Sequence, residues 1–356
     1  GETVAAVLQP GSTLAETAAR GAERVIDASG LLVIPGGVDP HTHMELTVGS
    51  SVAPGGAVVS SDDFETGTRA AAWGGTTTIV DFVTQHAGEV VRECVDARLA
   101  AAQGRCAIDY GFHQIIGGVD DQALQEMDAL VDEGITSFKL FMAYPGRLYS
   151  DDGQLLRAMQ QSAANGGLVM MHAENGLAID VLAAQAVERG ETGPEAHGRV
   201  RRSELEGEAV HRAVQLAADG AAPLYIVHLS CSEALEQVTI ARDRGANVFA
   251  ETCPQYLYLT LEETLARPGF EGAPWVCSPP IRTGHAHHHA DLWKGLRTND
   301  LSVVATDHCP FCRVDQKELG VADFRTIPNG IGSVEHRMDL LYQGVASGEI
   351  SLPRWV

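Results

Sequence analysis

Leu31-Leu32-Val33-Ile34-Pro35-Gly36-Gly37-Val38 is an apolar run that leads directly into Asp39-Pro40-His41-Thr42-His43. We predict that residues 31–38 form a buried strand and that the two histidines stand at its C-terminal tip. Because side chains two residues apart point to the same face of an extended chain, both imidazoles can reach one cation. His-x-His pairs also occur at His285–His289, in a chain that has 14 histidines. The preceding strand is what distinguishes His41 and His43.

Composition and charge exclude several classes of protein. The 356 residues are enough for one large barrel domain or two smaller domains. No run approaches the roughly 18 apolar residues of a membrane span, and no signal-peptide pattern opens the chain. The formal charge of −22 argues against nucleic acid or an anionic membrane as a partner. Seven scattered cysteines indicate free thiols and a cytoplasmic location.

Eight apolar runs of strand length alternate with segments of helical periodicity. The expected strands cover residues 31–38, 76–82, 106–116, 137–144, 168–172, 223–228, 247–253 and 301–307. The expected helices cover residues 63–73, 90–102, 122–133, 154–165, 204–219 and 232–244. This alternation is typical of a parallel sheet covered by helices. We predict an α/β fold, a (β/α)8 TIM barrel over residues 34–356, with a doubly wound open sheet as the alternative. Two further short strands are expected at residues 3–8 and 24–27.

Metal-binding residue types fall at the C-terminal ends of these strands, where a barrel carries its active site. In chain order they are His41 and His43, Lys139, His172, His228 and Asp307. A single histidine is more often a core or surface residue, but the shared position of all of them predicts a metal site.

Lys139 interrupts an otherwise apolar strand, where an unpaired ammonium is costly and its pKa falls. One interpretation is a snorkelling or ion-paired lysine. The other is a neutral amine that reacts with CO2 to give a carbamate, an anion whose two oxygens can bridge two cations. The residues alone leave both interpretations open.

Eight blocks in fixed order span nearly the whole chain: Asp39–His43, Phe138–Tyr144, His172–Asn175, His228–Ser230, Glu251–Leu257, Ser278–Arg282, Thr306–Phe311 and Pro328–Met338. Together they resemble the dihydropyrimidinase/hydantoinase branch of the amidohydrolase superfamily, and the last three blocks distinguish this branch from its relatives. The reaction implied is hydrolysis of a cyclic amide to an N-carbamoyl amino acid. The implied substrates are dihydropyrimidines (5,6-dihydrouracil, dihydrothymine) or 5-substituted hydantoins.

The resemblance also implies a binuclear zinc centre, whose geometry manganese or cobalt could share. It assigns His41, His43 and Asp307 to one ion and His172 and His228 to the other, bridged by N6-carboxylated Lys139 and a hydroxide. Asp307 is expected to carry the proton from the attacking hydroxide to the leaving nitrogen, and Tyr144 to donate a hydrogen bond to the oxyanion. Ser278 and Asn329 are expected to bind the amide edge of the substrate through their backbone groups. A homotetramer is the implied assembly.

Some features depart from the family pattern. The loop over residues 44–57 is longer than its counterpart, which bears on substrate range and stereochemistry. The family continues beyond Val356 with strands that complete a small β-sandwich domain, of which residues 1–33 are expected to form part. Glu45 stands where dihydroorotases carry an arginine for the substrate carboxylate, which argues against that activity.

Two other functions remain open. One is an allantoinase-like hydrolase, and the other is a catalytically inactive scaffold similar to the collapsin-response mediators, which have lost metal ligands. All six ligand positions are filled here, which favours the enzyme. The His285–His289 cluster is predicted to be a solvated loop and helix start. Cys309 and Cys312, in a CxxC pattern, are predicted to be thiols beside the site.

Overall fold

The computed structural model describes residues 3–48 and 57–356. The chain divides into two compact units, one reaching Pro35 and one running from Gly36 to Trp355. The boundary therefore lies two residues beyond the one predicted after residue 33. The predicted long loop over 44–57 falls partly outside the described residues. Its described ends form an antiparallel pair of short strands, β2 (Thr47–Val48) and β3 (Val58–Val59).

The first unit contains one helix, α1 (Thr13–Gly21), within its described residues 3–35. Ser12 caps this helix by accepting a hydrogen bond from the backbone of Ala15 at 3.2 Å. The strands predicted at 3–8 and 24–27 are wrong, because no strand is formed in these described residues. A strand needs a neighbouring segment for its backbone hydrogen bonds, and none of them pairs with one. The assignment of residues 1–33 to a β-sandwich stays a prediction.

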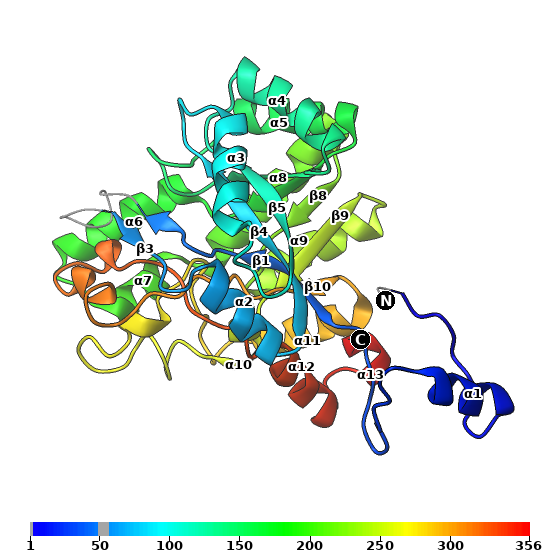
Figure 1. Ribbon diagram of the computed structural model, residues 1–356. Helices are drawn as coiled ribbons and strands as arrows, with labels where there is room; N and C mark the ends of the chain where they lie inside the picture. Colours follow the sequence, from blue (N-terminus) through cyan, green and yellow to red (C-terminus); the bar gives the residue numbers. More distant parts are fainter. Residues whose placement is uncertain (1–2, 49–56) are drawn as a thin grey trace. The chain divides into compact units, whose positions relative to one another are not determined.

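The second unit is built on eight parallel strands that follow one another in chain order around a sheet. They are β1 (Gly37–Thr42), β4 (Thr76–Gln85), β5 (Asp109–Ile116), β6 (Ser137–Phe141), β7 (Leu168–His172), β8 (Leu224–Ile226), β9 (Val248–Thr252) and β10 (Val303–Val304). A parallel bridge between Thr42 and His308 brings the segment after β10 beside β1 (Figure 1). The sheet therefore nearly closes, and the predicted (β/α)8 barrel is confirmed.

The first strand of the barrel lies further along the chain than predicted. It covers Gly37–Thr42 rather than residues 31–38. Residues 31–33 are exposed, because they have no strand beside them among the described residues. As a result, His41 lies inside β1 and His43 directly after it.

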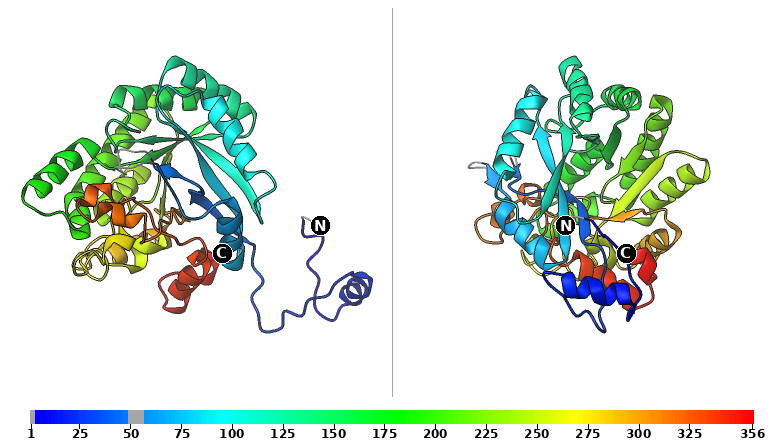
Figure 2. Two further views of the ribbon diagram at one scale, coloured as in Figure 1. Left: turned by 60° about the vertical axis from the view of Figure 1, so that its left-hand side comes forward. Right: turned by 45° about the vertical axis from the view of Figure 1, so that its right-hand side comes forward.

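Helices lie on the outside of these strands (Figure 1, Figure 2). They are α2 (Phe64–Trp73), α3 (Val91–Ala102), α4 (Asp121–Asp132), α5 (Asp152–Asn165), α6 (Gly176–Glu188), α7 (Pro194–Val200), α8 (Ser203–Gly220), α9 (Ser232–Asp243), α10 (Pro254–Tyr258), α11 (His288–Thr298), α12 (Arg337–Ala346) and α13 (Leu352–Trp355), with 3-10 turns η1 (Ala273–Trp275), η2 (Lys317–Gly320) and η3 (Phe324–Thr326). The six predicted helices match α2, α3, α4, α5, α8 and α9 to within two residues at each end. None of the helices in the described residues is both long and apolar enough to cross a bilayer.

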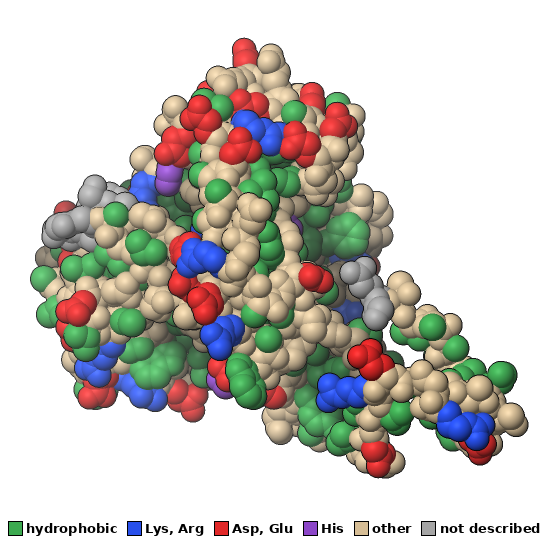
Figure 3. All heavy atoms as spheres, viewed as in Figure 1, with side chains coloured by type: hydrophobic (Ala, Val, Ile, Leu, Met, Phe, Trp, Pro, Cys, Tyr) green, Lys and Arg blue, Asp and Glu red, His purple; other side chains and the backbone are tan. Residues whose placement is uncertain are grey.

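Apolar side chains fill the barrel interior below its C-terminal mouth. This inner cluster consists of Phe82, Ile115, Phe141, Met170, Tyr225 and Val227, contributed by several strands. A much larger cluster packs between the strands and the helices. Figure 3 shows acidic side chains gathered over α4 and its neighbours, in keeping with the formal charge of −22. This packed cluster supports the side chains at the C-terminal mouth of the barrel from below.

Candidate metal centre

The strand ends bring the predicted site residues around one cavity of about 490 Å³. Those that line it are His43, Lys139, Tyr144, His172, His228, Ser278, Asp307 and Asn329. His41 is fully buried and contacts three of them: His43, Lys139 and Asp307. Residues from seven different segments of the chain are thus assembled at one mouth.

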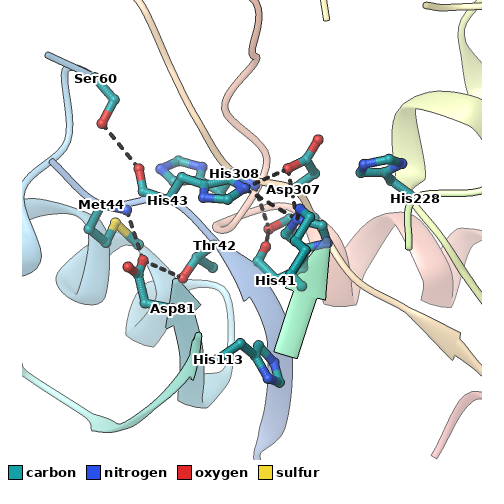
Figure 4. A network of polar contacts seen from close by, with 12 residues as sticks. His41, Thr42, His43, Met44, Ser60, Asp81, His113, His228, Asp307 and His308 are labelled. Carbon is teal, nitrogen blue, oxygen red and sulfur yellow. Dashed lines mark hydrogen bonds and ion pairs between the residues drawn. The ribbon is translucent and has the colours of Figure 1, made fainter. Parts of the chain in front are cut away.

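Three ligand-type side chains converge from opposite sides of the seam that nearly closes the barrel (Figure 4). Nε2 of His41 lies 3.2 Å from Nε2 of His43. Oδ1 of Asp307 lies 3.1 Å from the first of these nitrogens and 3.2 Å from the second. All three ligand atoms lie within 4.8 Å of one another, which is the arrangement that one cation requires.

A second pair of imidazoles stands beside this trio. The ring centroids of His172 and His228 are 4.5 Å apart, and His228 is 5.5 Å from the ring of His41. Nε2 of His172 is 2.7 Å from Oε2 of Glu174. Nδ1 of His228 and Nδ1 of His43 are buried without a hydrogen-bond partner among the described residues. A buried nitrogen is normally paired, so Nδ1 of His228 fits a site that takes a further ligand, whereas His43 faces His41 and Asp307 with its other nitrogen, Nε2.

The pKa shifts of three of the four histidines suit metal binding; burial and Lys139 act to lower the pKa of His41, but the carboxylates of Glu251 and Asp307 raise it above its usual value. Burial lowers the pKa of His43 to about 4, lowers that of His172, and holds that of His228 well below its usual value. These imidazoles are therefore neutral near pH 7, which is the form that binds metal. Burial acts to raise the pKa of Asp307, but the neighbouring His41 and His43 hold it well below its usual range. The carboxylate is therefore ionised.

Lys139 stands in the middle of β6 and points into the same site. Its Nζ is 3.0 Å from Nε2 of His41 and lies 4.4 Å above the ring of Phe82. Among the described residues no carboxylate lies within ion-pairing distance of this ammonium, although it is buried. Burial lowers its pKa to about 8, against the attraction of Asp307 and Glu251. The burial and the missing ion pair argue against the snorkelling or ion-paired lysine, and the lowered pKa increases the fraction of neutral amine that a carbamate requires.

Two acidic side chains that support the ligands were missed by the sequence analysis as functional residues. Glu251, at the end of β9, pairs through Oε1 with Nδ1 of His41 and accepts from the backbone of His228 at 3.1 Å. Its Oε2 accepts the hydroxyl of Tyr225 at 2.7 Å. Glu174 supports His172 and itself pairs with Arg201 at 2.9 Å. A buried acid inside an apolar strand was the signal that could have revealed Glu251.

Three of the predicted site residues adopt a left-handed backbone. Tyr144 has φ 62°, His228 φ 39° and Asp307 φ 52°. This conformation is costly for a residue with a Cβ atom and persists only where the surroundings impose it. Each of the three follows a strand and turns its side chain toward the cavity. Such concentrated strain is typical of a functional site.

The remaining sequence signals have structural explanations. His285 and His287 are exposed as predicted, but His288 is buried and His289 is half-buried. Nδ1 of His288 accepts from the backbone of Ser232 at 3.2 Å, and Nε2 of His289 lies 2.9 Å from the carbonyl of Leu259. These hydrogen bonds connect the start of α11 to the start of α9 and to the segment after α10. The two rings therefore have a structural role. Cys309 lines the cavity and Cys312 is exposed, both as free thiols.

Comparison with known proteins gives one consistent family. The model of the amidohydrolase family matches residues 32–327. A D-hydantoinase of Streptomyces coelicolor is 61% identical over 353 residues, which cover 99% of this chain and 73% of the relative. A crystal structure of a D-hydantoinase superposes with a TM-score of 0.89 at 44% identity, covering 94% of this chain and 71% of the other. A dihydropyrimidinase from Brevibacillus agri gives 0.86 at 43% identity, covering 93% and 72%.

Proposed function

This chain belongs to the amidohydrolase family, and from that premise we propose that it is a cyclic-amide hydrolase that opens 5-substituted hydantoins and dihydropyrimidines to N-carbamoyl amino acids. One observation carries this proposal. His43 and Asp307 line one cavity with Lys139, His172 and His228, and the buried His41 completes the trio behind them. This set of ligand-type side chains around one cavity supports a two-metal hydrolase.

Two zinc ions are the proposed cofactors. His41, His43 and Asp307 would hold one ion, and His172 and His228 the other. Lys139 would be carboxylated: the neutral fraction of its Nζ would form a bond to the carbon of CO2 and release a proton to solvent. The resulting anion would replace a costly buried ammonium and would offer carboxylate oxygens as metal ligands. When bound, the ions supply Lewis-acid activation of a water molecule and of the amide carbonyl.

The protein's own groups can carry out the proton transfers. Asp307 is ionised, so it can accept a proton from the attacking water and return it to the ring nitrogen that leaves. Burial raises the pKa of Tyr144, so its hydroxyl keeps its proton and can donate to the oxyanion that develops on the carbonyl. Ser278 and Asn329 lie in the wall of the same cavity and offer peptide groups to the amide edge of the ring.

We propose a narrower range of substrates than that of the amidohydrolase family as a whole. The resemblance to proteins named D-hydantoinase supports 5-substituted hydantoins of D configuration as preferred substrates, with dihydropyrimidines second. An allantoinase-like activity is the alternative. A non-catalytic scaffold is disfavoured, because all six proposed metal-binding positions carry ligand-type side chains.

Assembly and location complete the proposal. We expect a homotetramer, as the resemblance implies. All seven cysteines are free thiols, which supports the expected location in the reducing cytoplasm.

The test is ring opening of hydantoin and 5,6-dihydrouracil side by side, with zinc and bicarbonate supplied. Lys139→Ala should lose at least about a thousandfold in kcat/KM and bind less zinc, because a ligand shared by both ions is gone. Lys294→Ala is the matched control, since Lys294 is exposed on α11 and should retain full activity.

Three other results would change the assignment. Full activity of Lys139→Ala would exclude the bridging role. A wild-type protein that binds two zinc ions but opens neither ring would point to allantoin as the next substrate. A wild-type protein that binds no metal would favour the scaffold.

A further inference from the structure

Lys317, at the start of η2, is a buried cation that the catalytic scheme does not use. Its Nζ donates three hydrogen bonds, to the carbonyl oxygens of Val276 at 2.9 Å, Pro328 at 2.6 Å and Gly330 at 2.8 Å. An ammonium has three N–H donors, so its capacity is filled entirely by backbone carbonyls. The side chain is fully buried, and no carboxylate pairs with it among the described residues.

The three acceptors belong to two segments that border the cavity. Val276 lies two residues before Ser278, while Pro328 and Gly330 lie on either side of Asn329. The segments also contact each other directly, because the N–H of Gly330 donates to the carbonyl of Val276 at 2.9 Å. One ammonium thus joins both segments that carry the proposed ring-binding residues.

Other buried side chains occupy the neighbouring carbonyl groups. Nε2 of His197 donates to the carbonyl of Cys277 at 2.8 Å, and the hydroxyl of Tyr256 donates to that of Pro279 at 2.7 Å. By contrast, the backbone N–H and C=O groups of Ser278 and Asn329 make no hydrogen bond within the described part of the chain. Ser278 and Asn329 both line the cavity, so their peptide groups remain available to a bound ring.

Steric fit leaves the second segment little freedom to shift. Gly330 has φ 145°, and a Cβ atom built there would lie 2.1 Å from the carbonyl oxygen of Cys309. Only a glycine fits at this close approach, but glycine has a flexible backbone, so a further contact is needed to fix its conformation. The hydrogen bond from Lys317 to the Gly330 carbonyl provides this contact.

We propose that Lys317 is a positioning residue for substrate binding: its ammonium fixes the Ser278 and Asn329 peptide groups in the orientation that receives the amide edge of the ring. This inference rests on the proposed function, since it assumes that a cyclic amide occupies the cavity. Charge-assisted bonds to three carbonyls offset the cost of burying the ammonium. Without it, the buried carbonyls of Pro328 and Gly330 lose their donor, and the two segments are joined directly only by the bond from Gly330 N–H to the carbonyl of Val276.

The test compares Lys317→Met, which keeps the length of the side chain but has no donor, with Lys317→Gln, which keeps two N–H donors. We expect KM for the ring substrate to rise about tenfold or more in Lys317→Met and less in Lys317→Gln. Bound zinc should remain at the wild-type level, because Lys317 contacts no proposed ligand. Amide hydrogen exchange should become faster in residues 276–280 and 328–331.

Arg337→Met provides the control for loss of a buried cation. Arg337 is also buried and donates to the carbonyl of Val304 at 3.1 Å and to the hydroxyl of Thr76 at 3.2 Å, but it does not line the cavity. This variant should lose stability without a rise in KM. If Lys317 had only a structural role, Lys317→Met would likewise lose stability without a rise in KM.

The outcomes separate the two proposals. If the wild type opens a ring and both Lys317 variants keep its KM and its exchange rates, the positioning role is refuted while the hydrolase assignment stands. If Lys317→Met does not fold, Lys317→Gln alone decides between these results. A wild type that binds zinc but opens neither ring refutes the proposed substrate, and the positioning role falls with it.

Discussion

Glu251 is the side chain on which the position of His41 depends most directly. Its two carboxylate oxygens contact Nδ1 of His41, the backbone N–H of His228 and the hydroxyl of Tyr225. One buried acid therefore orients one imidazole and supports the strained backbone of another. Side chains that orient metal ligands in this way commonly change metal affinity when they are replaced.

We predict that Glu251→Gln lowers zinc affinity by about 10- to 100-fold, because the neutral amide keeps the size of the side chain but loses the charge that orients the imidazole. Equilibrium dialysis of zinc and the zinc dependence of kcat measure the change. Tyr225→Phe is the matched control, since it removes only the hydroxyl bond to Oε2 and should have a smaller effect. Unchanged zinc affinity in Glu251→Gln would contradict this role.

Single residues also show the limits of sequence analysis. The ligand types at the strand ends could be predicted, because their position follows from the periodicity of the strands. The left-handed conformations of Tyr144, His228 and Asp307 could not, since none of them is glycine and the surrounding barrel imposes the strain. The hydrogen bonds of Lys317 could not be predicted either, because its acceptors lie up to 41 residues away from it in the chain.

At the scale of elements, the helices were the more predictable part. Their apolar faces repeat with the helical period, and Asp63 and Asp151 supply capping boxes to α2 and α5. Strand ends were less predictable, because pairing with neighbours decides them. β10 contains only Val303 and Val304, although the apolar run predicted residues 301–307.

Beyond the end of β10, the side chain of Asp39 forms the hydrogen bonds that connect this segment to β1. Oδ2 of Asp39 accepts the hydroxyl of Thr306 at 2.6 Å, and its Oδ1 accepts the N–H of Thr306 at 3.2 Å. These bonds join β1 to the segment after β10, next to the bridge between Thr42 and His308. Asp39 is fully buried, so the seam of the barrel depends on a side chain in place of a full strand ladder.

We predict that Asp39→Ala lowers the free energy of unfolding by about 3 kcal/mol, because it leaves the buried N–H groups of Thr306 and His41 without their acceptor and the Thr306 hydroxyl with only the carbonyl of His41. Urea denaturation measures the change. Asp109→Ala, at the exposed start of β5, should stay within about 0.5 kcal/mol of the wild type. A loss below about 1 kcal/mol for Asp39→Ala would mean that the seam is held by other contacts.

For the molecule as a whole, metal binding and folding should be coupled. The ligands come from strands at opposite ends of the chain, so the assembled site exists only in the folded barrel, and each bound ion stabilises that state by mass action. An ion present at 100 times its Kd contributes about 2.7 kcal/mol. We therefore predict that a zinc chelator lowers the Tm and abolishes ring opening, and that added zinc with bicarbonate restores both. Lys139→Ala should respond less to the chelator, because it holds less metal from the start. Identical melting curves with and without chelator would show that the barrel folds independently of the ions, and the side chains around His41 would then be held by the protein scaffold alone.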